Sequence, residues 1–309
     1  MDKLNFVKGT TPLQKLNFHV GNTEIYMKRD DLIGFAGGGN KVRLFEYIAA
    51  EIKKCKAEKI VTFGSVHSNH VRVAAVVAAY LHIDCDLIIL TDETSLKKQY
   101  TPNLRLVAYY PRVHVEYCPI EKAHDFIDVY LTKQKDAGIN TYWIPGGGHL
   151  AIAVQGYVDA GREIVSQLDN LGVVAEAAFV PCGTGTTQAG LISSMYNRMS
   201  VYGITVARSV ERCRKEIGSL IMDANSAKNI DMVNINSLIH ILLNQIVYGK
   251  KDKQIDETIK ALIESDGVFL DPVYNAKSFR QMINFLEEHT EIKTAVYVNT
   301  GGYQNLFAE

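Results

Sequence analysis

The sequence lacks the features that mark membrane, secreted and nucleic-acid-binding proteins. No apolar run approaches the roughly 20 residues that a membrane helix needs, and the amino terminus has no apolar core of the kind found in secretion signals. The charges balance, with 33 Lys and Arg against 34 Asp and Glu, so nothing indicates binding to nucleic acid or to an anionic membrane. We therefore expect the partner to be a small molecule.

Patterns for metal sites and disulfides are missing as well. The five cysteines contain no Cys-x-x-Cys pair, and no histidine pair accompanies them at the spacing of a zinc site. An odd number of isolated cysteines is typical of reduced intracellular proteins. The sequence therefore predicts a cytoplasmic protein without a bound metal.

Short β-branched segments alternate with helical segments along most of the chain. The strand-like segments lie at residues 59–65, 85–91, 113–119, 141–147, 176–183, 202–208 and 294–302. Helical periodicity is found at residues 70–82, 121–138, 156–170, 187–199, 252–267 and 277–289. Such alternation predicts an α/β fold whose parallel sheets carry helices on both faces. We expect two open-sheet domains: a larger one from residues 1–46 and 155–309, and a smaller one, residues 47–154, inserted into it.

A loop rich in glycine and threonine follows one of these predicted strands. In "FVPCGTGTTQAGL", residues 179–191, Gly183 and Gly185 allow close backbone approach, and the helix after the loop presents its free N–H groups. Hydroxyl donors are added by Thr184, Thr186 and Thr187. The loop lacks the Lys-Ser/Thr ending of a nucleotide P-loop and the spacing of a dinucleotide site. It indicates a site for a phosphate monoester; the alternative is a strand-to-helix turn with threonine caps.

A lysine occupies the first turn of another predicted helix. "GGGNKVRLFEYIAAEI", residues 37–52, has apolar residues at helical spacing, and Asn40 is predicted to cap the helix. Because the helix dipole disfavours a cation there, we expect the pKa of Lys41 to fall. A neutral amine is what Schiff-base chemistry requires, whereas an ordinary lysine would be solvated and cover apolar surface. An amine together with a phosphate site describes the binding of pyridoxal 5′-phosphate.

Eight motifs, in order along the chain, carry a resemblance to a known family. They are "KRDDLIGFAGGGNKVRLFEY", "GSVHSNHVRVAAVVAAYL", "IPGGGHLAIAVQGYVDAGREI", "PCGTGTTQAGL", "GITVAR", "YG" at Tyr248, "LDPVYNAKSF" and "NTGGYQNLF". With these the chain resembles the pyridoxal-phosphate enzymes of fold type II (the tryptophan synthase β-like group), and within it the D-cysteine desulfhydrase and 1-aminocyclopropane-1-carboxylate deaminase family. The resemblance implies a homodimer with the cofactor in the cleft between the two domains. The larger domain would bind the cofactor and the smaller one would close over the substrate.

The resemblance also implies roles for individual residues. Lys41 matches the lysine that forms the Schiff base and then acts as the base at the substrate Cα, and residues 183–187 match the phosphate loop. Ser68, Asn69 and His70 match the family's asparagine loop. In that loop Asn69 would bond the phenolic oxygen of the cofactor, and Ser68 with the loop N–H groups would bind the substrate carboxylate.

Three further residues are candidates for contact with the substrate. Tyr248 and Tyr274 match two active-site tyrosines of the family that face the substrate. His149 stands in "GGGHL" where the family more typically has Gly-Gly-Ser-Asn, so it is a candidate for substrate contact or proton relay. The alternative for these residues is a packed or satisfied polar side chain.

Two positions separate the branches of this family. The deaminase branch carries a glutamate directly after the tyrosine that matches Tyr274 and a leucine at the position of Thr300, and the desulfhydrase branch carries small hydroxyl residues at both. In this chain Thr300 fits the desulfhydrase branch, whereas Asn275 fits neither branch. Because a glutamate is absent from both places, a neutral residue would face the pyridine nitrogen of the cofactor. The resemblance then implies β-elimination from a small β-substituted amino acid such as D-cysteine, giving pyruvate, ammonia and the leaving group. Ring opening of 1-aminocyclopropane-1-carboxylate and β-replacement stay open as alternatives.

Overall fold

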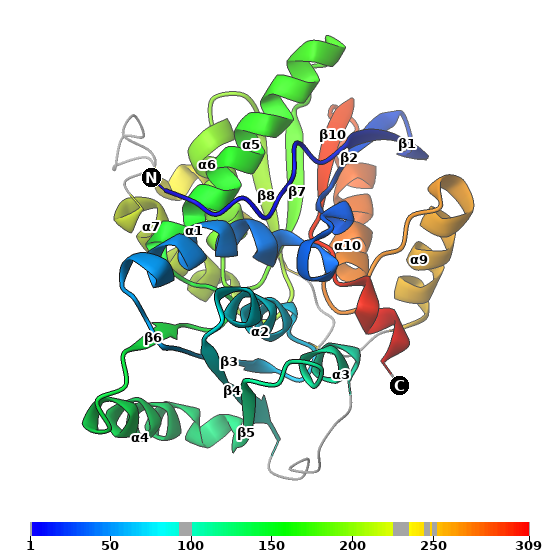
Figure 1. The fold of residues 1–309 in the computed structure, drawn as a ribbon. Coiled ribbons are helices and arrows are strands. Elements are labelled where there is room, and N and C mark those ends of the chain that lie inside the picture. The colour runs from blue at the N-terminus through cyan, green and yellow to red at the C-terminus, as the bar shows by residue number, and fades with distance from the viewer. Residues whose placement is uncertain (1, 93–100, 225–234, 244–247, 249–251, 309) are drawn as a thin grey trace.

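The chain forms two β-sheets that are covered by helices. The computed structural model describes residues 2–92, 101–224, 235–243, 248 and 252–308. In Figure 1 the larger sheet lies above the smaller one, and helices surround both. Within the described residues, no helix is both long and apolar enough to cross a membrane. The predicted α/β class with parallel-sheet domains is confirmed.

The larger sheet has six strands in the order β1-β2-β10-β7-β8-β9, and every neighbouring pair is parallel except β1 with β2. Its strands are β1 (Leu13–Val20), β2 (Thr23–Arg29), β7 (Ala177–Cys182), β8 (Ser200–Thr205), β9 (His240–Leu242) and β10 (Thr294–Asn299). The hairpin of β1 and β2 was not predicted, because β1 is mixed in polarity and only two of its eight residues are buried. The turn Gly21-Asn22 between them is the local signal that could have identified it. Strand β9 was also missed, because three half-buried residues are too few for a periodic pattern.

The smaller sheet has four parallel strands in the order β5-β4-β3-β6. They are β3 (Lys59–Ser65), β4 (Asp84–Thr91), β5 (Val113–Pro119) and β6 (Thr141–Ile144). All four were predicted, because apolar β-branched runs bounded by turn residues are typical of strands buried on both faces. These strands lie between residues 59 and 144. The domain boundaries at residues 46/47 and 154/155 stay a prediction.

Helices cover both faces of each sheet. They are α1 (Asn40–Lys54), α2 (Asn69–Leu81), α3 (Pro102–Val107), α4 (Ala123–Asp136), α5 (Ala151–Leu171), α6 (Thr186–Met195), α7 (Val210–Asp223), α8 (Ile235–Leu238), α9 (Lys253–Asp266) and α10 (Asn275–Glu288), with the short 3-10 turns η1 (Asp30–Leu32), η2 (Phe35–Gly37), η4 (Ile120–Lys122) and η6 (Tyr303–Phe307). On the larger sheet, α5 and α6 pack on one face, and α9 and α10 on the other. On the smaller sheet, α2 and α4 take the two faces. Helices α3, α7 and α8 were not predicted.

A buried cluster of charges anchors helix α1 to its neighbours. The guanidinium of Arg43 donates to both carboxylate oxygens of Asp30 at 2.9 Å, and it also forms a 2.9 Å ion pair with Glu163 of α5. Lys28 of β2 donates to Glu163 at 2.8 Å, and the Tyr157 hydroxyl donates to Asp30 at 2.6 Å. Burial raises the pKa of Asp30, but the charge and hydrogen bonds of Arg43, together with Tyr157 and Lys28, leave that pKa below its ordinary value. The two positive and two negative charges balance. Their contacts join α1 to β2 and α5.

We expect replacement of Arg43 by methionine to destabilise the fold strongly. The carboxylates of Asp30 and Glu163 would lose their shared cation, and breaking such a buried pair costs about 3–5 kcal/mol. Urea unfolding at pH 7 measures the change. The matched control is Arg198→Met, which removes an exposed pair with Asp169 and should barely move the unfolding midpoint. A loss for R43M no larger than that of the control would contradict this account of the cluster.

Candidate active site

A cavity of about 480 Å³ opens where strands of both sheets end. The ends of β3 and β7 and the segment after β8 reach it, together with the starts of α1, α2 and α6, as expected for the carboxyl ends of parallel strands. Most of the predicted site residues line it: Lys41, Ser68, Asn69, His70, Gly183, Thr184, Gly185, Thr186, Thr187, Tyr248, Tyr274 and Thr300. Two do not, Asn275 and His149. Sequence motifs that lie far apart along the chain are therefore brought to one place.

Helix α1 begins in tight contact with the end of β10. Gly39, with a φ of +98°, is the residue before the helix, so the prediction that Asn40 caps it is wrong. The backbone N–H of Asn40 instead donates to the Thr300 carbonyl at 3.0 Å, and its side-chain amide donates to the Thr187 hydroxyl at 2.9 Å. A Cβ on Gly39 would lie 2.5 Å from the Thr300 oxygen, so only glycine permits this approach.

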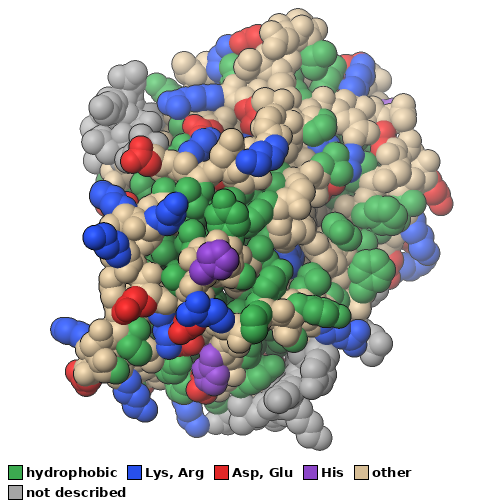
Figure 2. Space-filling view, in the orientation of Figure 1, with side chains coloured by type: hydrophobic (Ala, Val, Ile, Leu, Met, Phe, Trp, Pro, Cys, Tyr) green, Lys and Arg blue, Asp and Glu red, His purple; other side chains and the backbone are tan. Residues whose placement is uncertain are grey.

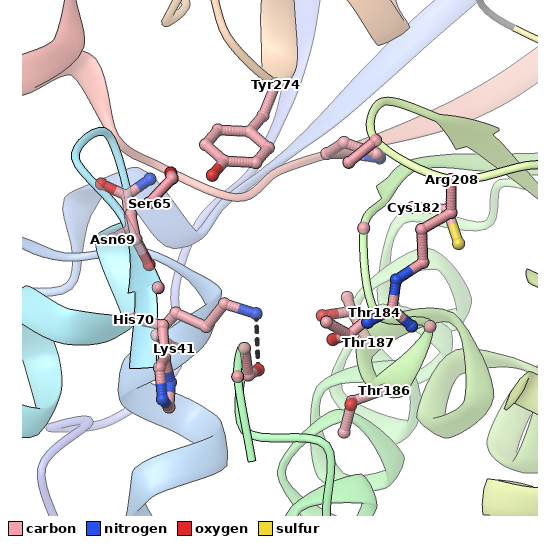
Figure 3. A pocket seen from close by; sticks show the side chains of 18 of the residues that line it. Lys41, Ser65, Asn69, His70, Cys182, Thr184, Thr186, Thr187, Arg208 and Tyr274 are labelled. Atoms are coloured by element: carbon pink, nitrogen blue, oxygen red, sulfur yellow. Dashed lines mark hydrogen bonds between the residues drawn. The ribbon is translucent and has the colours of Figure 1, made fainter. Parts of the chain in front are cut away.

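The amine of Lys41 projects into the cavity (Figure 3). Its Nζ donates to the carbonyl of Gly147 at 2.9 Å, and none of the ion pairs found among the described residues includes it. Burial, reinforced by the positive charge of Arg208, lowers the pKa of Lys41 to about 8. The predicted direction is confirmed, but the main cause is removal from water rather than the helix dipole. Near pH 8 a large share of the amine is therefore neutral.

The phosphate loop, residues 183–187, faces Lys41 across the cavity (Figure 3). It joins β7 to α6, and Gly185 adopts a φ of +88° with a built Cβ only 2.7 Å from Ile217. At Gly183 a built Cβ would meet no atom within 4 Å, so the loop backbone is open to the cavity there. The N-terminal turn of α6 and the threonines of the loop therefore present N–H and hydroxyl groups opposite an amine, a set of donors that suits an anion.

The asparagine loop lies at the start of α2. Ser68 is the residue that caps this helix, and its hydroxyl accepts from the N–H of Val71 at 3.5 Å. The Oδ1 of Asn69 accepts from Arg72 at 2.6 Å and from the Asn103 amide at 3.1 Å. The amide nitrogen of Asn69 is therefore the group left to donate in the cavity. Sequence reasoning missed Arg72 and Asn103, since their role depends on tertiary contacts.

Hydrogen bonds assign a neutral tautomer to His70. The Thr62 hydroxyl donates to the carbonyl of Ile144 at 2.6 Å, so it accepts from the Nε2–H of His70 at 2.7 Å. Burial, with a contribution from the charge of Lys41, lowers the pKa of His70 to about 3. The Nδ1 atom is buried and has no hydrogen-bond partner. His70 therefore offers an acceptor, not a positive charge.

Three hydroxyl groups form a chain at the edge of the cavity. The Tyr248 hydroxyl lies 2.6 Å from that of Tyr274 and 2.9 Å from the Ser65 hydroxyl. Burial raises the pKa of both tyrosines, so the phenols keep their protons at neutral pH. Ser65 was not among the predicted residues. Its place at the end of β3, in the polar stretch of residues 64–70, was the signal that could have identified it.

Thr300 and Asn275 play different parts. The Asn275 side chain is fully buried and donates to Asp271 and to the carbonyl of Gly301, both at 2.7 Å. Its Oδ1 accepts from the N–H of Thr300 at 2.9 Å. Asn275 therefore supports the segment behind the cavity, and Thr300 is the residue of the pair that lines it.

His149 lies behind the phosphate loop. Its Nδ1 is 3.0 Å from the carbonyl of Thr184, and its Nε2 is 2.8 Å from the carboxylate of Glu216 on α7. Both neighbours are acceptors, so the imidazole links α7 to the phosphate loop. The predicted contact of His149 with a substrate stays a prediction.

Comparison with known proteins gives one consistent family. A family model described as "Pyridoxal-phosphate dependent enzyme" matches residues 4–301. A D-cysteine desulfhydrase of Serratia proteamaculans is 31% identical, with 99% of this chain and 95% of that protein covered. A putative 1-aminocyclopropane-1-carboxylate deaminase of Pyrococcus furiosus is 28% identical over 99% of this chain and 93% of its own. A solved structure of a 1-aminocyclopropane-1-carboxylate deaminase homologue superposes with a TM-score of 0.86 at 26% identity, over 99% of this chain and 93% of that one.

The lowered pKa of Lys41 can be measured in protein freed of bound small molecules. Labelling by acetic anhydride, followed by mass spectrometry, should show Lys41 reaching half of its maximal reactivity near pH 8. Lys15 is the internal control, because its hydrogen bond to Glu24 raises its pKa and should keep it unreactive at that pH. If Lys41 reacted only above pH 10, its amine would not be the one poised for chemistry.

Proposed function

Because this chain belongs to the family of pyridoxal-phosphate-dependent enzymes that includes D-cysteine desulfhydrase, we propose that it catalyses β-elimination from a small β-substituted amino acid such as D-cysteine. The products would be pyruvate, ammonia and the leaving group. One observation carries the choice of reaction: among the described residues that line the cavity there is no Asp or Glu, and Thr300 is present. Without a carboxylate partner the pyridine nitrogen is less protonated, which suits elimination.

The cavity fits pyridoxal 5′-phosphate at both ends. Lys41 would hold its aldehyde carbon in a Schiff base, and the open backbone at Gly183 leaves room for its phosphate on the phosphate loop. The amide nitrogen of Asn69 would donate to its phenolic oxygen, and the Thr300 hydroxyl would face its ring nitrogen. When bound, the cofactor supplies the electron sink that stabilises negative charge at the substrate Cα.

The chain's own residues handle the protons. Lys41, with a pKa of about 8, takes the proton from the substrate Cα when its amine is neutral. Ser68 and the N–H groups at the start of α2 bind the substrate carboxylate. Tyr248 and Tyr274, linked to each other at 2.6 Å, hold phenolic protons in the cavity, where a departing thiolate can accept one. The buried, neutral His70 keeps positive charge away from the substrate amine.

Ring opening of 1-aminocyclopropane-1-carboxylate is the second candidate, because the Pyrococcus relative and the solved homologue bear names of that activity. A third is β-replacement, since it uses the same residues. The buried carboxylate of Asp271 is engaged by the backbone and side chain of Asn275, so it supports α10 and not a ring nitrogen in the cavity. That arrangement favours elimination over ring opening.

We also propose that the enzyme is a cytoplasmic homodimer. All five cysteines are free thiols, which suits a reducing compartment. Helix α3 contacts both α2 and η6. Large exposed apolar side chains lie on or next to these three elements: Tyr80, Leu106, Tyr109, Tyr303 and Phe307. Hydrophobic side chains also gather across the face seen in Figure 2. Light scattering on the purified protein should give twice the chain mass of 34.4 kDa.

A substrate screen tests the proposed reaction. With D-cysteine or β-chloro-D-alanine we expect steady pyruvate release, measured with lactate dehydrogenase, and much less from L-cysteine. With 1-aminocyclopropane-1-carboxylate no oxobutyrate should form. Oxobutyrate without pyruvate would indicate the deaminase activity instead. A single adduct replacing pyruvate when thiols or amines are added would indicate β-replacement.

Lys41→Ala should abolish turnover at saturating cofactor, with kcat reduced by at least about 100-fold, because the base at Cα is removed. Borohydride treatment of the wild-type protein should fix the cofactor's mass onto the peptide that contains Lys41. Lys15→Ala, an exposed change, should leave turnover and labelling intact. Cofactor mass on another lysine would contradict the assignment of Lys41.

A further inference from the structure

An arginine that the proposed mechanism does not use reaches the phosphate loop. Arg208 follows β8, which pairs in parallel with β7, so that Cys182 and Thr205 are partners at the ends of the two strands. The phosphate loop begins one residue after β7, and Arg208 lies three residues after β8. In Figure 3 the Arg208 side chain extends toward Thr184 and Thr187. It also lines the cavity.

The charge of Arg208 is poorly compensated. Its nearest carboxylate is that of Glu216, and the closest approach, from Nη1, is 3.9 Å. Glu216 is also the partner of His149 at 2.8 Å and of Arg212 at 3.7 Å. Two guanidinium groups therefore share one carboxylate, and both line the cavity whereas Glu216 does not. The excess positive charge faces the space between the phosphate loop and Lys41.

Burial and the nearby charge of Arg212 both disfavour the charged form of Arg208. Only 22% of the side chain is exposed. Burial, followed by repulsion from Arg212, lowers the pKa of Arg208, and Arg208 in turn contributes to the low pKa of Lys41. A cation held in these surroundings without a close partner is stabilised when an anion binds beside it. The phosphate loop supplies backbone N–H groups and hydroxyls but no charge of its own.

We propose that Arg208 binds the cofactor's phosphate group and determines the preference of this site for the phosphorylated cofactor over pyridoxal. The inference rests on the cofactor orientation given under the proposed function. The guanidinium would complete the phosphate loop from the β8 side, because its planar set of N–H donors matches two phosphate oxygens. Neutral donors would hold the phosphate from the loop side, and Arg208 would supply the charge.

The test compares two ligands that differ only in the phosphate. Protein freed of cofactor is titrated with pyridoxal 5′-phosphate and with pyridoxal, and the dissociation constants are measured from the absorbance change. For Arg208→Gln we expect binding of the phosphorylated ligand to weaken by about 10- to 100-fold, the range for loss of a hydrogen bond to a charged group. Binding of pyridoxal should change far less, because pyridoxal has no phosphate for Arg208 to contact and is affected only through the pKa of Lys41. Arg208→Lys keeps the charge but loses the planar pair of N–H donors. Its dissociation constant for pyridoxal 5′-phosphate should lie between those of the wild-type protein and R208Q.

Arg214→Gln is the matched control, because Arg214 is exposed on the same helix α7 as Glu216 and does not line the cavity. It should leave both dissociation constants unchanged, and circular dichroism melting of each variant verifies its folding. An unchanged ratio of the two constants in R208Q would overturn the proposal. The proposed function is tested separately, by pyruvate release from the wild-type protein, and a failure there would count against the function and not against Arg208.

Discussion

The contact between two backbone segments, at Gly39 and at Thr300, is the constraint on which the site depends. The first precedes helix α1 and the second follows strand β10, and the Asn40 N–H donates to the Thr300 carbonyl at 3.0 Å. A Cβ on Gly301 would lie 2.7 Å from the Cα of Gly39, so both segments need glycine at the contact. Because of this contact, Lys41 and Thr300 line the same cavity.

Electrostatics explains why this cavity favours one kind of ligand. Its described lining includes Lys41, Arg208 and Arg212 but no acid, and Glu216 lies behind it. Such a site attracts an anion at the end that carries the phosphate loop. At the other end the same surplus of positive charge, added to burial, keeps the Lys41 amine partly neutral. One charge distribution would therefore account both for the proposed affinity for phosphate and for the lowered pKa of the amine.

The sequence predicted the layered architecture and most of the cavity lining, because alternating strands and helices bring loops to the carboxyl ends of parallel strands. It could not predict relations that arise only in three dimensions. Asn40 was expected to cap α1, but Gly39 takes that position, and the Asn40 side chain bonds Thr187. Asn275 was expected to face the cofactor, yet its side chain is enclosed by Asp271 and Gly301. Ser65, Arg72 and Arg208 were missed because only their tertiary neighbours give them a role.

Arg43, the centre of the buried charge cluster, lies on helix α1 two residues after Lys41. The cluster joins β2, α1 and α5 through groups that take no part in binding. The helix that carries Lys41 is therefore held in place by contacts outside the cavity. In thermodynamic terms this part of the site is pre-organised: binding need not order the helix, so less conformational entropy is lost there, and more of the contact energy appears as affinity.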